Sequence, residues 1–280
     1  MKFLICAFMF ISCSLFSKEK CREETRYSTE TYTLSIGSIF QNEAPYLKEW
    51  IDYHLGIGVE HFFLYNNNST DDYLTVLIPY VDCGCVTLVQ WPSTDPDGTY
   101  FTFKVQCPAY TDAVKKARGI SQWIALIDID EFIVVQSHDS ISKLLDEYSY
   151  AGGLCVNWQC YGTSRIDQVP QGEILQHLVW KMKWNAPFNH NSKSIVQTEY
   201  ANECINPHFF NYSKFKYAVD SNHRKTDGCC HSVNIDKIRL NHYWTRDENF
   251  FRNSRLARYK RWKVNIQSSI DLANSMNEEY

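Results

Sequence analysis

Short apolar runs alternate with amphipathic segments over the first half of the chain. Runs with the length and composition of buried strands cover residues 32–40, 61–65, 86–91 and 123–127. After the first run, apolar side chains recur at helical spacing on one face: Leu47, Trp50, Ile51, His54 and Leu55. Further helices are predicted after residue 72 and over residues 102–118. This alternation predicts an α/β fold, with a mostly parallel sheet and helices on both faces.

The segment from Leu126 to Val135 places three carboxylates, Asp128, Asp130 and Glu131, within an apolar run that is predicted to be buried strand. Burying a bare carboxylate costs several kcal/mol unless it is paired or binds a metal. A strand ending in Asp-x-Asp therefore suggests two carboxylates held at a sheet edge for a cation. Alternatively, one Asp caps the next turn and another acid pairs with a buried Arg.

Polar stretches follow the predicted strands, at residues 41–43, 66–72, 92–100 and 128–131. The carboxyl ends of parallel strands meet at one edge of an α/β sheet, where ligands bind. We therefore expect these four stretches to converge on one site.

The second half of the chain is less regular. We predict a strand over residues 154–160 and a helix over residues 174–182. Residues 181–206 are rich in Asn and show no period, which predicts a mobile loop that closes over a ligand. Residues 247–265 form an amphipathic helix whose basic face is expected to lie toward solvent.

Composition limits the classes of function. The chain has 280 residues, 44% of them hydrophobic, which suffices for one large core. Its net charge is −4 and it has no basic run, so no nucleic-acid partner is expected. The eleven cysteines, an odd number, show no zinc-site spacing and leave the redox compartment open.

The first residues form a separate segment, in which Lys2 precedes the mostly apolar residues 3–16. This stretch has the length of a signal-peptide core and is shorter than the ~20 residues of a membrane-spanning helix. We expect residues 1–25 to be a cleaved signal peptide or a short membrane anchor, and residues 26–280 to form a single domain. A functional leader predicts a secretory-pathway or membrane-associated protein; the cytoplasmic face is the alternative in a bacterium.

Several blocks occur in an order and spacing typical of one family. They are Ser38-Ile39-Phe40-Gln41-Asn42-Glu43, residues 46–54, residues 58–67, Trp123-Ile124-Ala125-Leu126-Ile127-Asp128-Ile129-Asp130-Glu131-Phe132, Lys193-Ser194-Ile195-Val196 and Asn241-His242-Tyr243-Trp244-Thr245-Arg246. Over residues 34–260 the chain resembles glycosyltransferase family 92 and related family-2-like glycosyltransferases. The resemblance implies a GT-A fold, a nucleotide-sugar donor, a divalent metal and inversion at the anomeric carbon.

The same resemblance assigns roles to three residues. Asp130 would bind the metal, Asp128 would face the ribose or a metal-bound water as a further member of the metal site, and His242 would be another ligand. Carboxylate oxygens suit Mn²⁺ or Mg²⁺, and a histidine ligand favours Mn²⁺. Alternatively, His242 is a partly buried histidine that donates to a backbone carbonyl.

We expect the uridine half of a UDP-type donor to lie over the first two strands, near Asn42, Glu43, Asn67 and Asp71. Turn formation and helix capping explain these residues equally well. The resemblance places Lys193 and Arg246 near the diphosphate, along with Asp128 at the donor.

Inversion requires a general base on the acceptor hydroxyl. Asp167 and Glu173 are the acidic residues that follow the strand over residues 154–160, and both are candidates. Glu173 alternatively only begins the next helix.

The function expected from the resemblance is transfer of a hexose from a nucleotide sugar to a glycan or other hydroxyl acceptor. One alternative is a non-catalytic nucleotide-sugar- or glycan-binding module of the same fold. The other is a phosphatase that uses the Asp-x-Asp motif, although Phe132 stands where such enzymes place Thr or Val.

Overall fold

A computed structural model describes residues 31–92, 101–213, 215–227, 232–262 and 264–280. The leader predicted over residues 1–25 lies outside the described residues, as does most of the polar stretch 92–100. Within the described part of the chain, no helix combines the length and the apolar character needed to cross a membrane.

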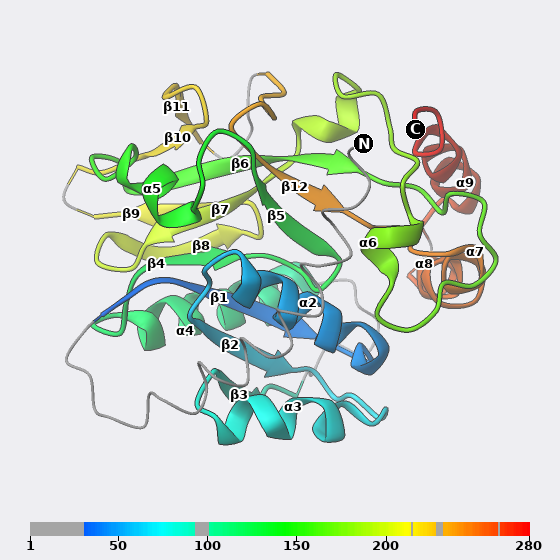
Figure 1. Ribbon diagram of the computed structural model, residues 1–280, viewed down its shortest axis with the longest axis horizontal. Coiled ribbons are helices and arrows are strands. Elements are labelled where there is room, and N and C mark those ends of the chain that lie inside the picture. The colour runs from blue at the N-terminus through cyan, green and yellow to red at the C-terminus, as the bar shows by residue number, and fades with distance from the viewer. Residues whose placement is uncertain (1–30, 93–100, 214, 228–231, 263) are drawn as a thin grey trace.

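The first half of the chain alternates strands and helices as predicted (Figure 1). Its elements are β1 (Tyr32–Phe40), α2 (Ala44–Gly56), β2 (His61–Asn66), α3 (Tyr73–Asp82), β3 (Val86–Gln90), η1 (Thr102–Gln106), α4 (Cys107–Ala117), β4 (Ser121–Leu126), β5 (Glu131–Val135) and α5 (Ile141–Asp146). The second half contains β6 (Gly153–Cys160), α6 (Ile174–His177), η2 (Pro187–His190), β7 (Ser192–Gln197), β8 (Ala201–Asn206), β9 (Phe209–Tyr212), β10 (Ala218–Asp220), β11 (Lys225–Thr226), β12 (Ile238–His242), α7 (Glu248–Phe250), η3 (Phe251–Arg255), α8 (Leu256–Arg261) and α9 (Ile266–Ser275).

The central sheet has the strand order β11-β10-β6-β7-β4-β1-β2-β3, and β12 joins it by pairing with both β5 and β6. Strands β4, β1, β2 and β3 are parallel neighbours. Strand β7 runs antiparallel between β4 and β6. The sheet is therefore mixed and mostly parallel, which confirms the predicted α/β architecture.

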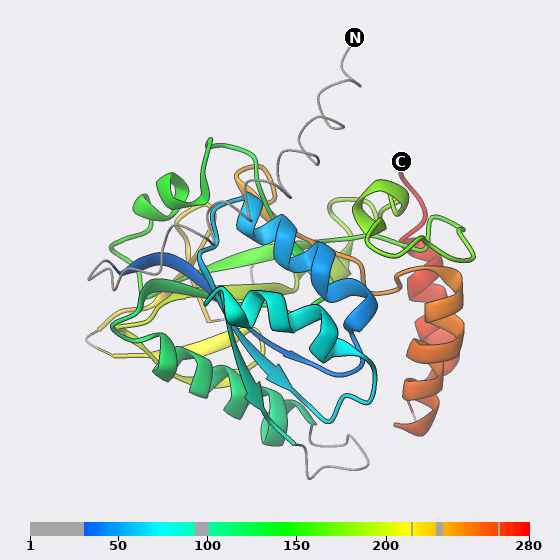
Figure 2. The ribbon, with the colours of Figure 1, turned by 60° about the horizontal axis from the view of Figure 1, so that its bottom comes forward.

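Helices cover both faces of the sheet because each has one apolar side. The buried residues of α2 and α3 form one core with the side chains of β1 and β6 that point toward them. Helix α4 and the β8–β9 hairpin form a second core on the other face. The C-terminal helices α7, α8 and α9 stand together at one side of the molecule (Figures 1 and 2).

Three expectations for the irregular regions were wrong. The apolar run from Leu126 to Val135 is two strands, β4 and β5, because the chain turns at residues 127–130 and β5 pairs with β12. The helix that begins at Ile174 ends at His177 instead of residue 182. Residues 181–206 are not one loop, since they include strands β7 and β8, and β7 is buried in the centre of the sheet.

The parallel strands bring the polar segments together as predicted. Phe40 at the end of β1 is in register with Asn66 at the end of β2, and Gly37 of β1 is in register with Leu126 at the end of β4. The residues that follow these three strands therefore share one edge of the sheet.

Candidate active site

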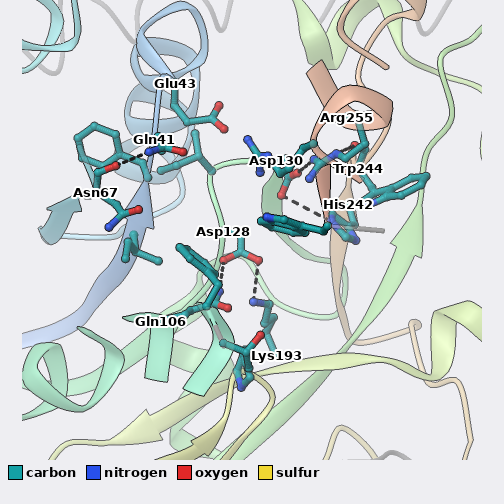
Figure 3. A pocket seen from close by; sticks show the side chains of 18 of the residues that line it. Gln41, Glu43, Asn67, Gln106, Asp128, Asp130, Lys193, His242, Trp244 and Arg255 are labelled. Carbon is teal, nitrogen blue, oxygen red and sulfur yellow. Dashed lines mark hydrogen bonds and ion pairs between the residues drawn. The ribbon is translucent and has the colours of Figure 1, made fainter. Parts of the chain in front are cut away.

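The carboxyl ends of β1, β2 and β4 open into a cleft of about 670 Å³ (Figure 3). The opposite walls come from η1, β6, β7, the turn between β8 and β9, the end of β12, and the helical segment η3–α8. The cleft therefore gathers residues from both halves of the chain around the Asp-x-Asp turn.

Asp128 lies at the centre of the cleft in Figure 3, with both carboxylate oxygens engaged by the protein. Its Oδ1 accepts hydrogen bonds from Tyr110 at 2.7 Å and Gln106 at 2.9 Å, and its Oδ2 accepts one from Lys193 at 2.8 Å. Burial disfavours the Asp128 anion, but the Lys193 charge holds the pKa of Asp128 below its usual value. Asp128 is thus an ionised group that orients a buried lysine.

Lys193 is 2% exposed and also lies 3.8 Å from Glu131 Oε2. Burial opposes its charge, but Asp128 and Glu131 raise the pKa of Lys193 above its usual range. Glu131 is fully buried and accepts a hydrogen bond from the backbone N–H of Asp128 at 2.8 Å. This hydrogen bond therefore helps to fix the backbone of the Asp-x-Asp turn.

Asp130 and His242 form a second polar pair at the cleft wall (Figure 3). Asp130 precedes β5 and His242 ends β12, and the antiparallel pairing of these strands brings the two residues together. His242 Nε2 lies 3.5 Å from Asp130 Oδ1, while Arg255 donates to Asp130 Oδ2 at 2.7 Å. Burial opposes ionisation of Asp130, but His242 and then Arg255 hold its pKa well below the usual value.

This pair fits a divalent cation, because an ionised oxygen and an imidazole nitrogen face the same space 3.5 Å apart. Within the described ranges, no group of three or more His, Cys, Asp or Glu side chains is arranged to hold a metal. A cation at Asp130 and His242 would therefore complete its coordination with water and substrate oxygens. Asp128 is not part of this pair, because Lys193 and its other donors occupy its oxygens; its role as a metal ligand stays a prediction.

The C-terminal helical segment supplies a positively charged wall. Arg255, Arg258 and Arg261 line the cleft beside Trp244 and Tyr259. Arg255 is paired with Asp130, but in the described part of the chain neither Arg258 nor Arg261 has a carboxylate within ion-pair distance. Burial and the charge of Arg255 lower the pKa of Arg258, which indicates positive charge that an anion would relieve.

The predicted donor-binding residues divide into two groups. Glu43, Asn67, Asp128 and Lys193 line the cleft. Asn67 is 3% exposed and its amide donates to the carbonyl of Trp91 at 2.9 Å, which leaves its own oxygen as an acceptor.

Asn42, Asp71 and Arg246 are not among the residues that line the cleft, and their contact with a donor stays a prediction. Asp71 accepts a hydrogen bond from the backbone N–H of Ala44 at 2.7 Å and so caps the start of α2. Asn42 accepts one from the backbone N–H of Thr70 at 2.7 Å. Both have the capping and turn-forming roles that the sequence allowed as alternatives.

Arg246 is 1% exposed and forms an ion pair with Glu43. Its guanidinium stacks on Tyr46 at 3.6 Å and on Phe250 at 4.4 Å from the ring centroids. Arg246 therefore fixes Glu43 from behind the cleft wall.

The two candidates for the general base lie outside the cleft. Asp167 is exposed, and the Glu173 side chain is 42% exposed and paired with His177 at 2.8 Å. Neither side chain is among the residues that surround the Asp-x-Asp turn, and the start of α6 is instead tied to α2, where the backbone N–H of Ile174 donates to Glu49 at 3.0 Å.

Sequence reasoning missed two features of the cleft. It assigned the arginines of residues 247–265 to an outward basic face, although their spacing of three residues, at 255, 258 and 261, marks one helix side. It also gave no role to His208, which lines the cleft from the turn between β8 and β9.

Comparison with known proteins gives a family match over most of the chain. The family model described as glycosyltransferase family 92 matches residues 30–268. A family 92 protein of Ricinus communis is 28% identical over 222 residues, which are 76% of this chain and 35% of that protein. A galactan β-1,4-galactosyltransferase of Arabidopsis thaliana is 32% identical over 126 residues, 42% of this chain and 24% of that protein. The chain thus spans about a third or less of the length of these relatives.

Solved structures show a weaker likeness. TarS of S. aureus in complex with UDP-GlcNAc is 14% identical, with a TM-score of 0.38 over 70% of this chain and 60% of that one. Glucosyl-3-phosphoglycerate synthase of Mycobacterium tuberculosis, in complex with Mn²⁺ and UDP, is 14% identical, with a TM-score of 0.29 over 45% of this chain and 44% of that one. At these TM-scores the likeness provides no correspondence between single residues.

Proposed function

The chain belongs to glycosyltransferase family 92, and on this premise we propose that it transfers a hexosyl group from a UDP-type nucleotide sugar to a hydroxyl group of a glycan, with a divalent cation in the cleft. Family membership argues against the phosphatase interpretation. The other alternative is a binding module without turnover, and the experiment below distinguishes it from an enzyme.

Two features of one cleft support the proposal: a pair of side chains suited to a cation, and arginines without carboxylate partners. Asp130 and His242 face the space that Arg258 and Arg261 also line, and these arginines have no carboxylate partner in the described residues. A nucleoside diphosphate needs both features, since its oxygens bind a cation on one side and guanidinium groups on the other. The unneutralised arginine charge therefore supports a diphosphate as the natural occupant.

A second polar surface of the cleft is proposed to bind the base and ribose of the donor. Gln41 and Asn67 follow β1 and β2, and the Gln41 amide donates to the backbone oxygen of Asn67 at 2.8 Å. This bond and the one from Asn67 to Trp91 fix both side chains, so the remaining carbonyl oxygens are held in place for a base or ribose hydroxyl.

As the bond between the anomeric carbon and the diphosphate oxygen breaks, negative charge develops on the diphosphate. A bound Mn²⁺ or Mg²⁺ would supply Lewis-acid stabilisation of the leaving group. The protein adds the guanidinium groups of Arg258 and Arg261, which line the cleft and would stabilise the developing charge.

The acceptor is proposed to enter past Trp158 and Phe188, aromatic side chains that line the cleft; Trp158 lies against His242, which is across the cleft from Gln41 and Asn67 (Figure 3). The rings of Trp158 and Phe188 pack at 5.6 Å between centroids and offer apolar surface suited to a sugar face. An acceptor hydroxyl that attacks the anomeric carbon on the face opposite the leaving diphosphate oxygen inverts the anomeric centre.

The proposal is tested by measuring UDP release from UDP-galactose, UDP-glucose and UDP-N-acetylglucosamine, with Mn²⁺ or EDTA and with galactan or other oligosaccharide acceptors. UDP-galactose comes first because relatives are named as galactan galactosyltransferases. We expect acceptor-stimulated release that EDTA abolishes.

The variant Asp130→Asn should lose this activity, and Asp271→Asn, at an exposed position of helix α9, should keep it. Equal UDP release by wild type and Asp130→Asn contradicts the proposed metal site. Metal-dependent UDP binding with no release from any donor identifies a binding module instead.

A further inference from the structure

The cleft carboxylates are committed to cations, which leaves the proton acceptor for the transfer reaction unassigned. Glu43 pairs with Arg246, Asp128 pairs with Lys193, and Asp130 pairs with Arg255. Burial opposes ionisation of Asp128 and Asp130, but Lys193 lowers the pKa of Asp128, and His242 and Arg255 lower the pKa of Asp130, which makes both poor proton acceptors. Burial raises the pKa of Glu43, but its carboxylate is held in the ion pair with Arg246.

His208 is the cleft residue whose basic atom is uncommitted. It lies in the short turn between β8 and β9, with Trp158 against its ring at 5.5 Å between centroids. Trp158 also contacts His242, at 4.3 Å between centroids, so one indole touches both His208 and the proposed metal pair. His208 therefore lies on the side of the cleft where the acceptor is proposed to enter.

Three hydrogen bonds hold His208 in place. Its backbone N–H donates to Asn206 Oδ1 at 2.8 Å, its backbone oxygen accepts from Ser194 Oγ at 2.8 Å, and its Nδ1 lies 2.5 Å from the carbonyl oxygen of Ser192. Two of the partners come from β7, the central strand that also carries Lys193. The imidazole is thus oriented by the sheet itself.

The contact with Ser192 settles the tautomer. A carbonyl oxygen only accepts hydrogen bonds, so Nδ1 must carry the proton and Nε2 must carry a lone pair. Among the described residues, Nε2 has no hydrogen-bond partner, and His208 lines the cleft.

We propose that His208 is a catalytic residue of the transferase reaction, whose Nε2 takes the proton of the acceptor hydroxyl. This inference rests on the function proposed above. The arrangement, a base whose other ring nitrogen is tied to a fixed acceptor, is the one by which proteins orient a histidine for proton transfer.

The step is a single displacement. The acceptor oxygen forms a bond to the anomeric carbon as its O–H proton moves to Nε2. The bond from the anomeric carbon to the diphosphate oxygen breaks, and its electron pair leaves with the diphosphate. The imidazolium then returns the proton to water after the products depart.

The surroundings of His208 keep its imidazole unprotonated before this step. Burial and the nearby Lys193 charge lower the pKa of His208 to about 4. Asp128 raises this pKa, and His242 lowers it by a smaller amount. The imidazole is therefore neutral near pH 7, and its Nε2 lone pair is available to accept a proton. Asp128, which lies close enough to raise the pKa, would stabilise the imidazolium while it exists.

The test compares His208→Gln and His208→Ala with His138→Ala, a control on a surface histidine paired with Glu147. We expect the His208 variants to lose about 100-fold to 10,000-fold in kcat, as for a lost general base. Their KM for the donor and their Kd for UDP with Mn²⁺ should stay within about threefold of wild type, because proton transfer does not contribute to ground-state binding. Added imidazole should restore part of the activity of His208→Ala and none of that of His208→Gln, whose side chain fills the site.

Two results overturn the inference alone: a His208→Gln variant with at least a third of wild-type kcat, or an inactive His208→Ala that imidazole does not rescue and that has also lost UDP affinity. The second result identifies His208 as a binding or structural residue. Absence of transfer by the wild-type protein with every donor instead overturns the proposed function, and this inference with it.

Discussion

Replacing Lys193 by Met should destabilise the protein strongly, because it leaves the Asp128 anion without its cation inside the fold. Lys193 is 2% exposed and lies 2.8 Å from Asp128. Removing one partner of a buried ion pair costs about 3–5 kcal/mol. The Asp128 side chain is 33% exposed, so water recovers part of the loss and we expect the lower end, about 3 kcal/mol.

The matched control is Lys116→Met, because Lys116 forms an ion pair of nearly the same length, 2.9 Å to Asp112, with side chains 41% and 28% exposed. Exposed pairs contribute about 1 kcal/mol or less. Thermal melting should show a loss of about 6–12 °C for Lys193→Met, at about 2–4 °C per kcal/mol for a chain of this size. Equal losses in the two variants refute the argument that burial of Lys193 makes this pair important.

The pH dependence provides a second check on the same variant. The folded-state pKa of Asp128 lies below its unfolded value, so the pair stabilises the fold fully above about pH 4 and the effect is lost as pH falls through the folded-state pKa. The stability difference between wild type and Lys193→Met should therefore narrow only as pH falls below about 4, since a protonated Asp128 needs no cation. The double variant Lys193→Met/Asp128→Asn should recover much of the loss at pH 7, and a difference that is constant with pH contradicts this reasoning.

Arg258→Met should raise the Kd for UDP about 10-fold or more, the effect of one lost hydrogen bond to a charged group. Arg252→Met, which changes a 63% exposed arginine of the same helical segment, should leave the Kd for UDP unchanged. Calorimetry measures the Kd of both variants, and equal values would show that Arg258 does not contact the donor. Asp71→Ala should cost about 1 kcal/mol of stability through the lost cap of α2 and leave UDP affinity within about twofold. A large loss of UDP affinity in Asp71→Ala would instead support the donor contact expected from the sequence.

The sequence predicts the first half of the fold well because local patterns decide it. The strands from Tyr32 to Leu126 and the helices between them have apolar spacing that matches their burial, and Asp128 and Asp130 follow a strand as expected. The convergence at one sheet edge then follows from parallel pairing alone.

Strand β7 could not be predicted from local pattern because its burial depends on distant partners. Ser192, Lys193 and Ser194 are polar, and each is 2% exposed or less in the centre of the sheet. Lys193 is compensated by Asp128, 65 residues away in the sequence, and Ser194 by the carbonyl of His208, 14 residues away. Resemblance to a family identified Lys193, whereas periodicity predicted a loop.

The cleft arginines were misplaced for a related reason. The spacing of Arg255, Arg258 and Arg261 shows that they share a helix side, but the direction of that side depends on how η3 and α8 dock against Trp244 and the end of β12. Glu43, whose side chain is 14% exposed, similarly gave no sign in the sequence of its distant partner Arg246. Long-range ion pairs therefore define most of what the sequence left open at this site.

The most direct test of the proposed site is a calorimetric titration of UDP into the protein with Mn²⁺ and with EDTA, for wild type and His242→Ala. A site built on Asp130 and His242 predicts that Mn²⁺ strengthens UDP binding by wild type, and that His242→Ala needs about 10-fold more Mn²⁺ or greater for the same effect. A melting curve of each variant verifies that the fold is intact. UDP affinity that is the same with Mn²⁺ and with EDTA, or a Mn²⁺ requirement that His242→Ala does not change, contradicts the account.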